Sequence, residues 1–414
     1  MAEESDRIVV TGVGAVSPYG IGHEVLWQGL AAGKNAVTRL PFPHDALPVR
    51  VGASVPDFDP DALLGHRTAR RTARFGQFAL VAAREALAMS GLDLSDPEVA
   101  EETGVVIGTA GGLFQGGDQE QVLQARGARR VDPLYLSKWA GYMAAVRVGM
   151  ELGLHGVATT VNSACASGLD AIGQAMHLVR VGRAERILAG GTEAILNPLA
   201  VAVLGQIGAL TRREDPEGAS RPFDRERDGF VLAEGAGVLV LERESRARAR
   251  GAPILAEVAG AGWSFDARDE TAPDAAGQAL AMRRALADAG VRPQEVDWVK
   301  AHGTSTVLND RTETAAIKAV LGEAAYRVPV SSMKSMIGHA ASASGAMEAV
   351  AAVSALRHGL IPPTAHLEHP DPECDLDYVP GRARPAPLRT VLLNAFGLGG
   401  QNACIVLRRW DGAA

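Results

Sequence analysis

Cys165 lies where a short apolar strand is expected to end and a helix to begin. A β-branched run ends at Val161, and residues 168–181 carry apolar side chains at helical spacing. A thiol beside a helix N-terminus is close to free backbone N–H groups, which favour the thiolate and can hold an oxyanion. A lone cysteine in such a turn is more often a small buried residue, so other parts of the chain must decide between packing and chemistry.

Two histidines and a lysine stand at comparable places in the second half of the chain. His302 ends an apolar segment and precedes a Gly-Thr-Ser-Thr turn. His339 follows Gly338, five residues after Lys334, and precedes a run of alanines and serines. Glycine and other small residues beside a polar side chain let a ligand or a second backbone approach closely. If folding brings these loops to Cys165, the site would combine a nucleophile with two imidazoles and an ammonium group.

Composition narrows the classes of function. The 414 residues carry a formal net charge of −7, which gives no reason to expect nucleic acid or an anionic membrane as a partner. Cys165, Cys374 and Cys404 are too few for a disulfide framework or a four-cysteine zinc site, and free thiols fit a reducing compartment. Neither a signal peptide nor an apolar run of membrane length is visible. We therefore expect a cytoplasmic protein without a metal site.

Short apolar strands alternate with amphipathic helices along the chain. Strands are expected at residues 7–16, 105–108, 156–161, 186–191, 238–241, 254–260, 297–302, 390–393 and 404–407. Helices are expected at residues 75–90, 136–152, 168–181, 275–290, 310–321 and from 345 onward. This order indicates an α/β fold with helices on both faces of the sheets. We expect two intimately packed halves, residues 1–252 and 253–414, with a similar strand–helix rhythm.

Five motifs resemble those of the β-ketoacyl–acyl carrier protein synthases, the condensing enzymes of fatty-acid and polyketide assembly. They lie at residues 160–170, 220–229, 301–306, 334–339 and 396–402, in the family's order. Segments 309–316, 328–332 and 370–378 resemble most closely the ketosynthase subunit of type II (dissociated) polyketide synthases. The resemblance implies a thiolase-like fold, in which two similar βαβ-rich halves form five layers, α-β-α-β-α, around the active site.

The resemblance implies a 3-oxoacyl-[acyl-carrier-protein] synthase. Cys165, with a depressed pKa, would accept an acyl group and then undergo decarboxylative Claisen condensation with malonyl-ACP. His302 and His339 would donate hydrogen bonds to the thioester oxygen of the extender. The backbone N–H groups of Cys165 and Leu398 would form the oxyanion hole. The first half of the chain would thus supply the nucleophile, and the second the histidines and the glycine-rich oxyanion loop.

Further residues take supporting roles by the same resemblance. Lys334 and Glu348 would order the site, while Glu313 and Asp310 would fix the histidine loop. Contacts to the phosphopantetheine arm, the extender or the acyl chain are implied for Thr304, Thr306, Phe230, Ala110, Leu204 and Leu398. The last three are small for their positions, which predicts a roomier or differently gated acyl channel. No cofactor of its own is implied, because both substrates arrive on the phosphopantetheine of acyl carrier protein (ACP).

Acyl carrier protein and a second ketosynthase-type subunit are the implied partners. The basic residues that match carrier-docking positions are Arg67, Arg70, Arg71, Arg129 and Arg130. A basic run of this kind is also typical of a merely solvated face. Tyr135 matches a residue that crosses the dimer interface to close the acyl pocket of the partner. The dimer would contain either two copies of this chain or one copy and a chain-length-factor-like subunit.

Three other functions use part of this set of residues. A cysteine hydrolase pairs its nucleophile with one histidine and an orienting Asn or Asp, whereas this chain offers two histidines and a lysine. A thiolase-type enzyme condenses CoA esters with a second cysteine as base, but neither Cys374 nor Cys404 lies in a motif that suggests this role. A non-elongating partner subunit would lack the cysteine that this chain has at position 165.

Overall fold

The computed structural model describes residues 6–40, 42, 47, 49–111 and 117–412. Its main sheet runs β11-β10-β14-β15-β9-β1-β8-β7-β5-β6, with β2 paired to β1. Strands β1 and β9 pair only at Val9↔Glu257 and Val10↔Ala256. The sheet therefore divides at this narrow junction into two halves of five main strands each, and the short β2 is added to the half that contains β1.

The two half-sheets have the same topology. The strands of the first are β1 Ile8–Ser17, β5 Thr103–Gly108, β6 Ala158–Val161, β7 Arg186–Glu193 and β8 Gly235–Arg243. Those of the second are β9 Ala256–Phe265, β10 Trp298–Lys300, β11 Val330–Ser331, β14 Thr390–Gly397 and β15 Gln401–Arg409. In each, the second strand pairs in parallel with the third and fourth, and the last two pairings are antiparallel. The chain thus contains a structural repeat, although no fixed-period repeat is visible in its sequence.

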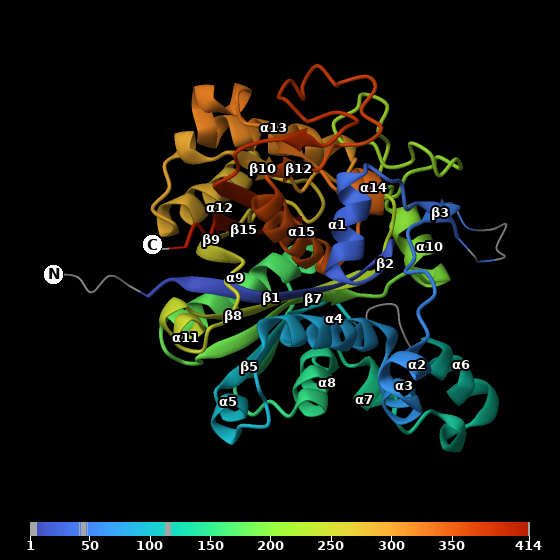
Figure 1. Ribbon diagram of the computed structural model, residues 1–414. Helices are drawn as coiled ribbons and strands as arrows, with labels where there is room; N and C mark the ends of the chain where they lie inside the picture. Colours follow the sequence, from blue (N-terminus) through green and yellow to red (C-terminus); the bar gives the residue numbers. More distant parts are fainter. Residues whose placement is uncertain (1–5, 41, 43–46, 48, 112–116, 413–414) are drawn as a thin grey trace.

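Helices cover both faces of each half-sheet and produce the expected five layers (Figure 1). The outer helices are α4 Arg74–Ser90 and α8 Met143–Leu152 on the first half, and α12 Ala275–Asp288 and α13 Val307–Leu321 on the second. The central layer holds α9 Ser167–Arg180 and α15 Ser344–His358, which contact both half-sheets. Alternating side chains explain this sandwich: Val238 and Val240 pack with α4, whereas Leu239 and Leu241 pack toward the centre. The α-β-α-β-α prediction is confirmed.

Small residues let the two central helices touch. A Cβ atom at Gly168 would lie 2.7 Å from the Ser342 carbonyl oxygen, and one at Gly345 would lie 2.9 Å from the Leu169 side chain. Larger residues at either position would push α9 and α15 apart. Since the cysteine turn precedes α9 and the His339 segment precedes α15, this contact fixes the distance between the two reactive loops.

The predicted helix over residues 136–152 is wrong as a single element. The structure has α7 Tyr135–Trp139 and α8, separated by an extended residue, Ala140, with ψ 131°. Gly141 then packs so closely that an added Cβ would lie 2.8 Å from the Gly111 carbonyl oxygen. The break is thus a tertiary contact that the apolar spacing could not reveal.

Shorter elements complete the described chain. The helices are α1 His23–Ala31, α2 Pro60–Leu64, α3 His66–Arg71, α5 Pro97–Glu101, α6 Gly117–Arg126, α10 Pro198–Gln206, α11 Glu244–Ala249 and α14 Lys334–Ile337. The short strands are β2 Gly20–Ile21, β3 Thr38–Arg39, β4 Val51–Gly52, β12 Leu360–Ile361 and β13 Arg384–Pro385. The 3-10 turns are η1 Ala128–Arg130, η2 Ala164–Ala166, η3 Pro293–Glu295, η4 Gly322–Tyr326 and η5 Ala341–Ala343. Within the described ranges, no helix combines the length and apolar character needed to cross a bilayer.

Candidate active site

Cys165, His302 and His339 line one cavity of about 350 Å³. The cysteine comes from η2, ahead of α9, whereas His302 follows β10 and His339 precedes η5. The first part of the chain therefore supplies the cysteine of this set, and the later part supplies both histidines. Phe230 lies on the same wall, with its ring centroid 5.1 Å from that of His339.

The surroundings of the Cys165 thiol have opposing effects on its pKa. Burial raises its pKa, and the buried carboxylate of Glu193 acts in the same direction. Hydrogen bonds from the backbone N–H groups of Leu398 and Cys165, together with the charge of Lys334, lower the pKa. On balance the pKa is raised, so the expectation of a depressed thiol pKa is wrong here, because desolvation outweighs the two hydrogen bonds and the charge of Lys334. The two N–H groups lie together beside the sulfur, where they could also hold the oxyanion formed on a carbon bonded to that sulfur.

The two imidazoles are held neutral. Their ring centroids lie 5.3 Å apart with planes at 87°, and each residue is at most 3% exposed. Burial lowers the pKa of both histidines well below the ordinary value, and the positive charge of Lys334 lowers both pKa values further. A neutral imidazole carries one N–H group and one free lone pair. Both rings can therefore donate a hydrogen bond to an oxygen in the cavity without carrying a charge.

A buried network of charged side chains, Lys334, Glu348 and Lys300, supports the backbone of His302. Lys334 Nζ donates to the His302 carbonyl oxygen at 2.8 Å and to Glu348 Oε1 at 2.6 Å. The other oxygen of Glu348 accepts a hydrogen bond from Lys300, which also donates to the Asn394 carbonyl oxygen at 2.9 Å. Burial lowers the pKa of Lys300 to about 8. Lys300 was not predicted as a site residue from the sequence, although a lysine inside an apolar strand is itself a signal, since buried amines need a partner.

Glu313 holds the backbone of the histidine loop. Its Oε1 accepts the His302 N–H at 2.8 Å, and its Oε2 accepts the Gly303 N–H at 2.8 Å. Oε1 also accepts a hydrogen bond from Asn394 Nδ2 at 3.0 Å. The two backbone N–H groups just after β10 therefore both donate to one carboxylate from α13. The position supports the role that the resemblance implies for Glu313.

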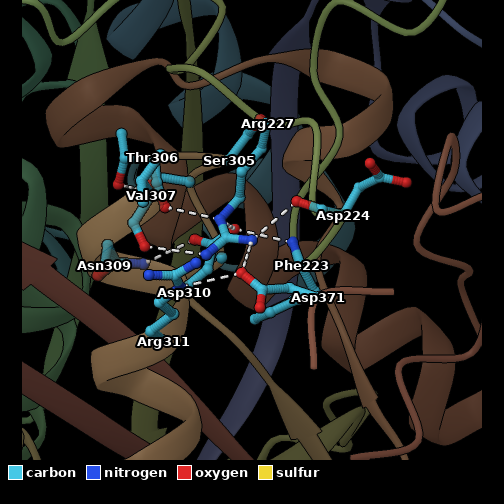
Figure 2. Close-up of polar contacts among 12 residues, drawn as sticks. Phe223, Asp224, Arg227, Ser305, Thr306, Val307, Asn309, Asp310, Arg311 and Asp371 are labelled. Carbon is cyan, nitrogen blue, oxygen red and sulfur yellow. Dashed lines mark hydrogen bonds and ion pairs between the residues drawn. The ribbon is translucent and has the colours of Figure 1, made fainter. Parts of the chain in front are cut away.

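Asp310 acts on the same loop through Arg227, as Figure 2 shows. Arg227 is buried, lies 3.4 Å from Asp310 Oδ2 and donates to Asp371 Oδ2 at 2.8 Å. Its remaining N–H groups donate to the carbonyl oxygens of Thr306 at 3.0 Å and Val307 at 2.9 Å. One guanidinium therefore ties the end of the histidine loop to two carboxylates. The Oγ1 atoms of Thr304 and Thr306 lie 2.9 Å apart in that loop, and both residues line the cavity.

The glycine-rich loop closes over the cysteine turn. Gly397 approaches so closely that an added Cβ would lie 2.5 Å from the Ser163 carbonyl oxygen. Gly399 and Gly400 have φ values of +95° and +83°, which L side chains rarely adopt. Between them and Gly397, Leu398 lines the cavity with 53% of its surface exposed. A large apolar side chain thus stands at the cavity mouth.

Other predicted residues lie outside the described lining of this cavity. Ala110 instead donates its N–H to Ser342 Oγ at 2.9 Å and to Glu193 Oε2 at 3.2 Å. Leu204 packs beside the core cluster that contains Leu210 and Val231. The side chains at the proposed docking and interface positions are exposed: Arg67, Arg70, Arg71, Arg129, Arg130 and Tyr135. A hydrogen bond from Lys138 lowers the pKa of Asp132, and the charge of Arg70 on α3 adds a smaller effect in the same direction, so α3 and the segment after η1 share one surface.

Comparisons with known proteins agree on one family. Residues 5–247 match the model described as beta-ketoacyl synthase, N-terminal domain, and residues 255–368 match beta-ketoacyl synthase, C-terminal domain. The chain is 43% identical over 415 residues to 3-oxoacyl-[acyl-carrier-protein] synthase 2 of Synechocystis sp., covering 99% of each chain. It is 44% identical over 415 residues to putative polyketide beta-ketoacyl synthase 1 of Streptomyces halstedii, covering 97% of this chain and 98% of that one.

Solved structures give the same result. The ishigamide ketosynthase/chain length factor superposes with a TM-score of 0.90 at 37% identity, over 98% of this chain and 100% of that one. A type II PKS acyl-carrier protein in complex with its ketosynthase bound to the hexaketide gives a TM-score of 0.88 at 35% identity, over 99% and 100%. A beta-ketoacyl synthase from Burkholderia phymatum gives 0.91 at 35% identity, over 98% and 100%.

Proposed function

The chain belongs to the β-ketoacyl synthase family of condensing acyltransferases, and we propose that it extends an acyl group held on Cys165 with a malonyl group carried by ACP. The observation that carries this proposal is the shared cavity of Cys165, His302 and His339. Two neutral imidazoles and two backbone N–H groups beside a thiol suit acyl transfer followed by enolate chemistry.

In the first half-reaction, the Cys165 sulfur attacks the thioester carbon of acyl-ACP. The thiol proton moves to a neutral imidazole in the same cavity, and the carbonyl oxygen becomes an oxyanion within reach of the Cys165 and Leu398 N–H groups. Collapse of the tetrahedral intermediate breaks the bond to the carrier sulfur, which takes the proton and leaves as a thiol. The products are acyl-Cys165 and free carrier.

In the second half-reaction, malonyl-ACP loses CO2 and the electron pair of the broken C–C bond forms an enolate. The N–H groups of His302 and His339 donate hydrogen bonds to the enolate oxygen, where negative charge develops in the transition state. The enolate carbon then attacks acyl-Cys165, and expulsion of the Cys165 thiolate gives 3-oxoacyl-ACP. A proton taken up by the thiolate restores the starting enzyme.

We propose ACP and a second ketosynthase-type subunit as partners. Relatives of this chain include a structure described as an acyl-carrier protein in complex with its ketosynthase and another described as a ketosynthase/chain length factor. Strand β6 is the last strand of its half-sheet, and Tyr135 and Tyr142 are exposed at 38% and 52%. An unpaired sheet edge with exposed aromatic side chains suits pairing with another subunit. The basic surface at α3 and η1 suits the docking of an acidic carrier.

We place the reaction in type II polyketide or specialised fatty-acid assembly. A relative named as a putative polyketide beta-ketoacyl synthase and one named 3-oxoacyl-[acyl-carrier-protein] synthase 2 have similar identity to this chain, 44% and 43%. The roomy acyl channel, the division of the chain at residue 252, the cytoplasmic location and the absence of a resident cofactor stay predictions. Transfer of acyl groups of different length and rigidity to Cys165, followed by mass spectrometry, tests the channel. A sharp preference for short saturated chains would count against it.

The other candidate functions fit the site less well. A thiolase-type base would have to be a second cysteine in the cavity, but Cys374 and Cys404 are buried and outside its described lining. A hydrolase would orient a histidine with Asn or Asp, whereas the side-chain partner of the His339 ring is Ser344. A non-elongating subunit would have no use for Cys165 beside two histidines.

Intact-protein mass spectrometry with acyl-ACP and malonyl-ACP tests the proposal. We expect a mass increase equal to the acyl group at Cys165, followed by release of 3-oxoacyl-ACP and CO2. Cys165→Ala should form neither the acyl-enzyme nor the product, whereas the matched change Cys374→Ala should form both. Product formation by Cys165→Ala would disprove the assignment of the nucleophile.

A further inference from the structure

Ser344 is a buried serine that contacts the ring of His339. It is the first residue of α15 and is 2% exposed. Its Oγ lies 2.9 Å from His339 Nδ1 and accepts the Ala340 backbone N–H at 2.9 Å. We infer that Ser344 is a positioning residue that donates its hydroxyl proton to His339 Nδ1 and so keeps the ring proton on Nε2, facing the cavity.

The direction of this hydrogen bond follows from the partners of the hydroxyl. The Ala340 N–H can only donate, so Oγ must accept there and has one proton left to give. Among the described residues, the His339 ring is the remaining side-chain or backbone partner of this Oγ. If Nδ1 carried the proton instead, the hydroxyl hydrogen would be buried without an acceptor, which native structures avoid.

The other half of the chain contains the same device with a different acceptor. Ser167 is the first residue of α9, and its Oγ accepts the Ser163 N–H at 2.9 Å, four residues before it. There the hydroxyl proton goes to the Ala164 carbonyl oxygen at 2.6 Å. The repeat thus places a serine that both accepts and donates at the start of each central helix. In the second half the imidazole of His339 takes the place of the carbonyl acceptor.

The consequence for the proposed reaction is specific to one histidine. His339 is neutral because burial and nearby lysine charges lower its pKa. Its ring therefore carries a single proton, and the position of that proton decides whether the ring presents an N–H donor or a lone pair to the cavity. With Nδ1 engaged by Ser344, Nε2 is the nitrogen left for a substrate oxygen. His302 differs, since its Nδ1 is buried without a hydrogen-bond partner among the described residues. This inference rests on the proposed function only for its catalytic consequence.

The experiment measures the tautomer and the reaction separately on the full-length protein. The first readout is the 15N spectrum of the histidine side chains, assigned to His339 by comparison with His339→Gln. We expect His339 with a protonated Nε2 in the native protein, a mixture of tautomers in Ser344→Ala, and the native pattern in Ser344→Thr, which keeps the hydroxyl. Ser354→Ala is the matched control, because that serine lies in the same helix and, within the part of the chain that the structure describes, its hydroxyl bonds only the Val350 carbonyl oxygen.

The second readout is decarboxylation of malonyl-ACP. Ser344→Ala should lower kcat about tenfold with KM unchanged, less than the 10²–10³-fold loss on removing an oxyanion donor outright. Ser344→Thr and Ser354→Ala should stay near the native rate. A native His339 protonated on Nδ1, or an unchanged tautomer in Ser344→Ala, would overturn the inference. Failure of the native protein to decarboxylate malonyl-ACP would instead overturn the proposed function, while the spectrum still decides the role of Ser344.

Discussion

Replacing Glu313 with glutamine tests whether one buried carboxylate sets the position of His302. The two side chains have nearly the same shape, but glutamine has one acceptor oxygen where glutamate has two. In the native protein Oε1 accepts hydrogen bonds from the His302 N–H and from Asn394, and Oε2 accepts the Gly303 N–H at 2.8 Å. If the glutamine oxygen takes the place of Oε1, the new NH2 group takes the place of Oε2 and faces the Gly303 N–H. Two donors then point at each other, so the loop must move.

The size of the effect follows from the hydrogen bonds that change. Leaving the buried Gly303 N–H without an acceptor costs about 1–3 kcal/mol, and the two bonds that remain lose their charge assistance. Burial raises the pKa of Glu313, so the charged form is costly to bury and the neutral amide recovers part of the loss. We expect a net destabilisation of about 2 kcal/mol. With an unfolding entropy of roughly 2 cal/mol/K per residue, 414 residues give a fall in Tm of about 2 °C.

The catalytic effect should be larger than the effect on stability. A shift of about 1 Å in a positioned group can cost about 100-fold in rate, so Glu313→Gln should lower kcat for malonyl-ACP decarboxylation by about that factor. Alkylation of Cys165 should stay near the native rate, because the cysteine turn does not contact Glu313. Glu257→Gln, which changes another buried glutamate on β9, is the control. Native decarboxylation by Glu313→Gln with an unchanged Tm would refute the reasoning.

Three further changes test other parts of the site. Glu193→Gln removes a negative charge that raises the pKa of Cys165, so the thiol should react with iodoacetamide at lower pH than in the native protein. Burial raises the pKa of Glu193 from 4.5 to about 7, so the stability that its neutral form contributes is fully present below about pH 4.5 and is lost as the pH rises from there to about 7. Over this range the Tm of the variant should rise relative to that of the native protein, and an unchanged difference would contradict this. Joint substitution of Arg129 and Arg130 by Glu should lower kcat/KM for carrier-bound substrate about tenfold at low salt but spare alkylation of Cys165, and loss of both would indicate misfolding instead. Arg227→Lys keeps the charge but loses the planar fork that bonds the Thr306 and Val307 carbonyl oxygens. It should destabilise the protein by about 2 kcal/mol and raise KM for carrier-bound substrate, measured by thermal unfolding and steady-state kinetics. A native KM would argue against the proposed role of the end of the histidine loop in binding that substrate.

The fold and the residues that meet in the cavity were largely predictable, because each left a local trace in the sequence. Apolar runs gave the strands and periodic apolar positions gave α4, α9 and α12 to within a few residues of their ends. Cys165 and His302 followed such runs directly and were followed by small residues. The five-layer order came from the resemblance instead, since strand–helix alternation is also typical of other α/β folds.

The supporting contacts were not predictable, because they join residues that are far apart in the sequence. Glu348 meets both Lys300 and Lys334, separated from them by 48 and 14 positions. The pKa of Cys165 was predicted in the wrong direction for the same reason: the helix start is local and visible, whereas desolvation by the surrounding halves appears only after folding. Burial is a property of the assembled layers, so sequence patterns that describe one element at a time understate it.

The duplicated topology explains why the reactive groups meet at the centre of the molecule. In each half, the turn before the central helix contains an alanine with positive φ, Ala164 at +50° and Ala341 at +41°. The residue after each alanine differs: the first turn has Cys165 and the second has Ser342, whose Oγ donates to the Ala164 carbonyl oxygen at 3.1 Å. One turn thus presents a thiol to the cavity, and its counterpart uses a hydroxyl to brace the backbone beside that thiol. Because backbone strain of this kind persists only where surrounding contacts enforce it, the contact between α9 and α15 holds both turns in place. One copy of the motif thus carries the proposed nucleophile, and the other supports the backbone beside it.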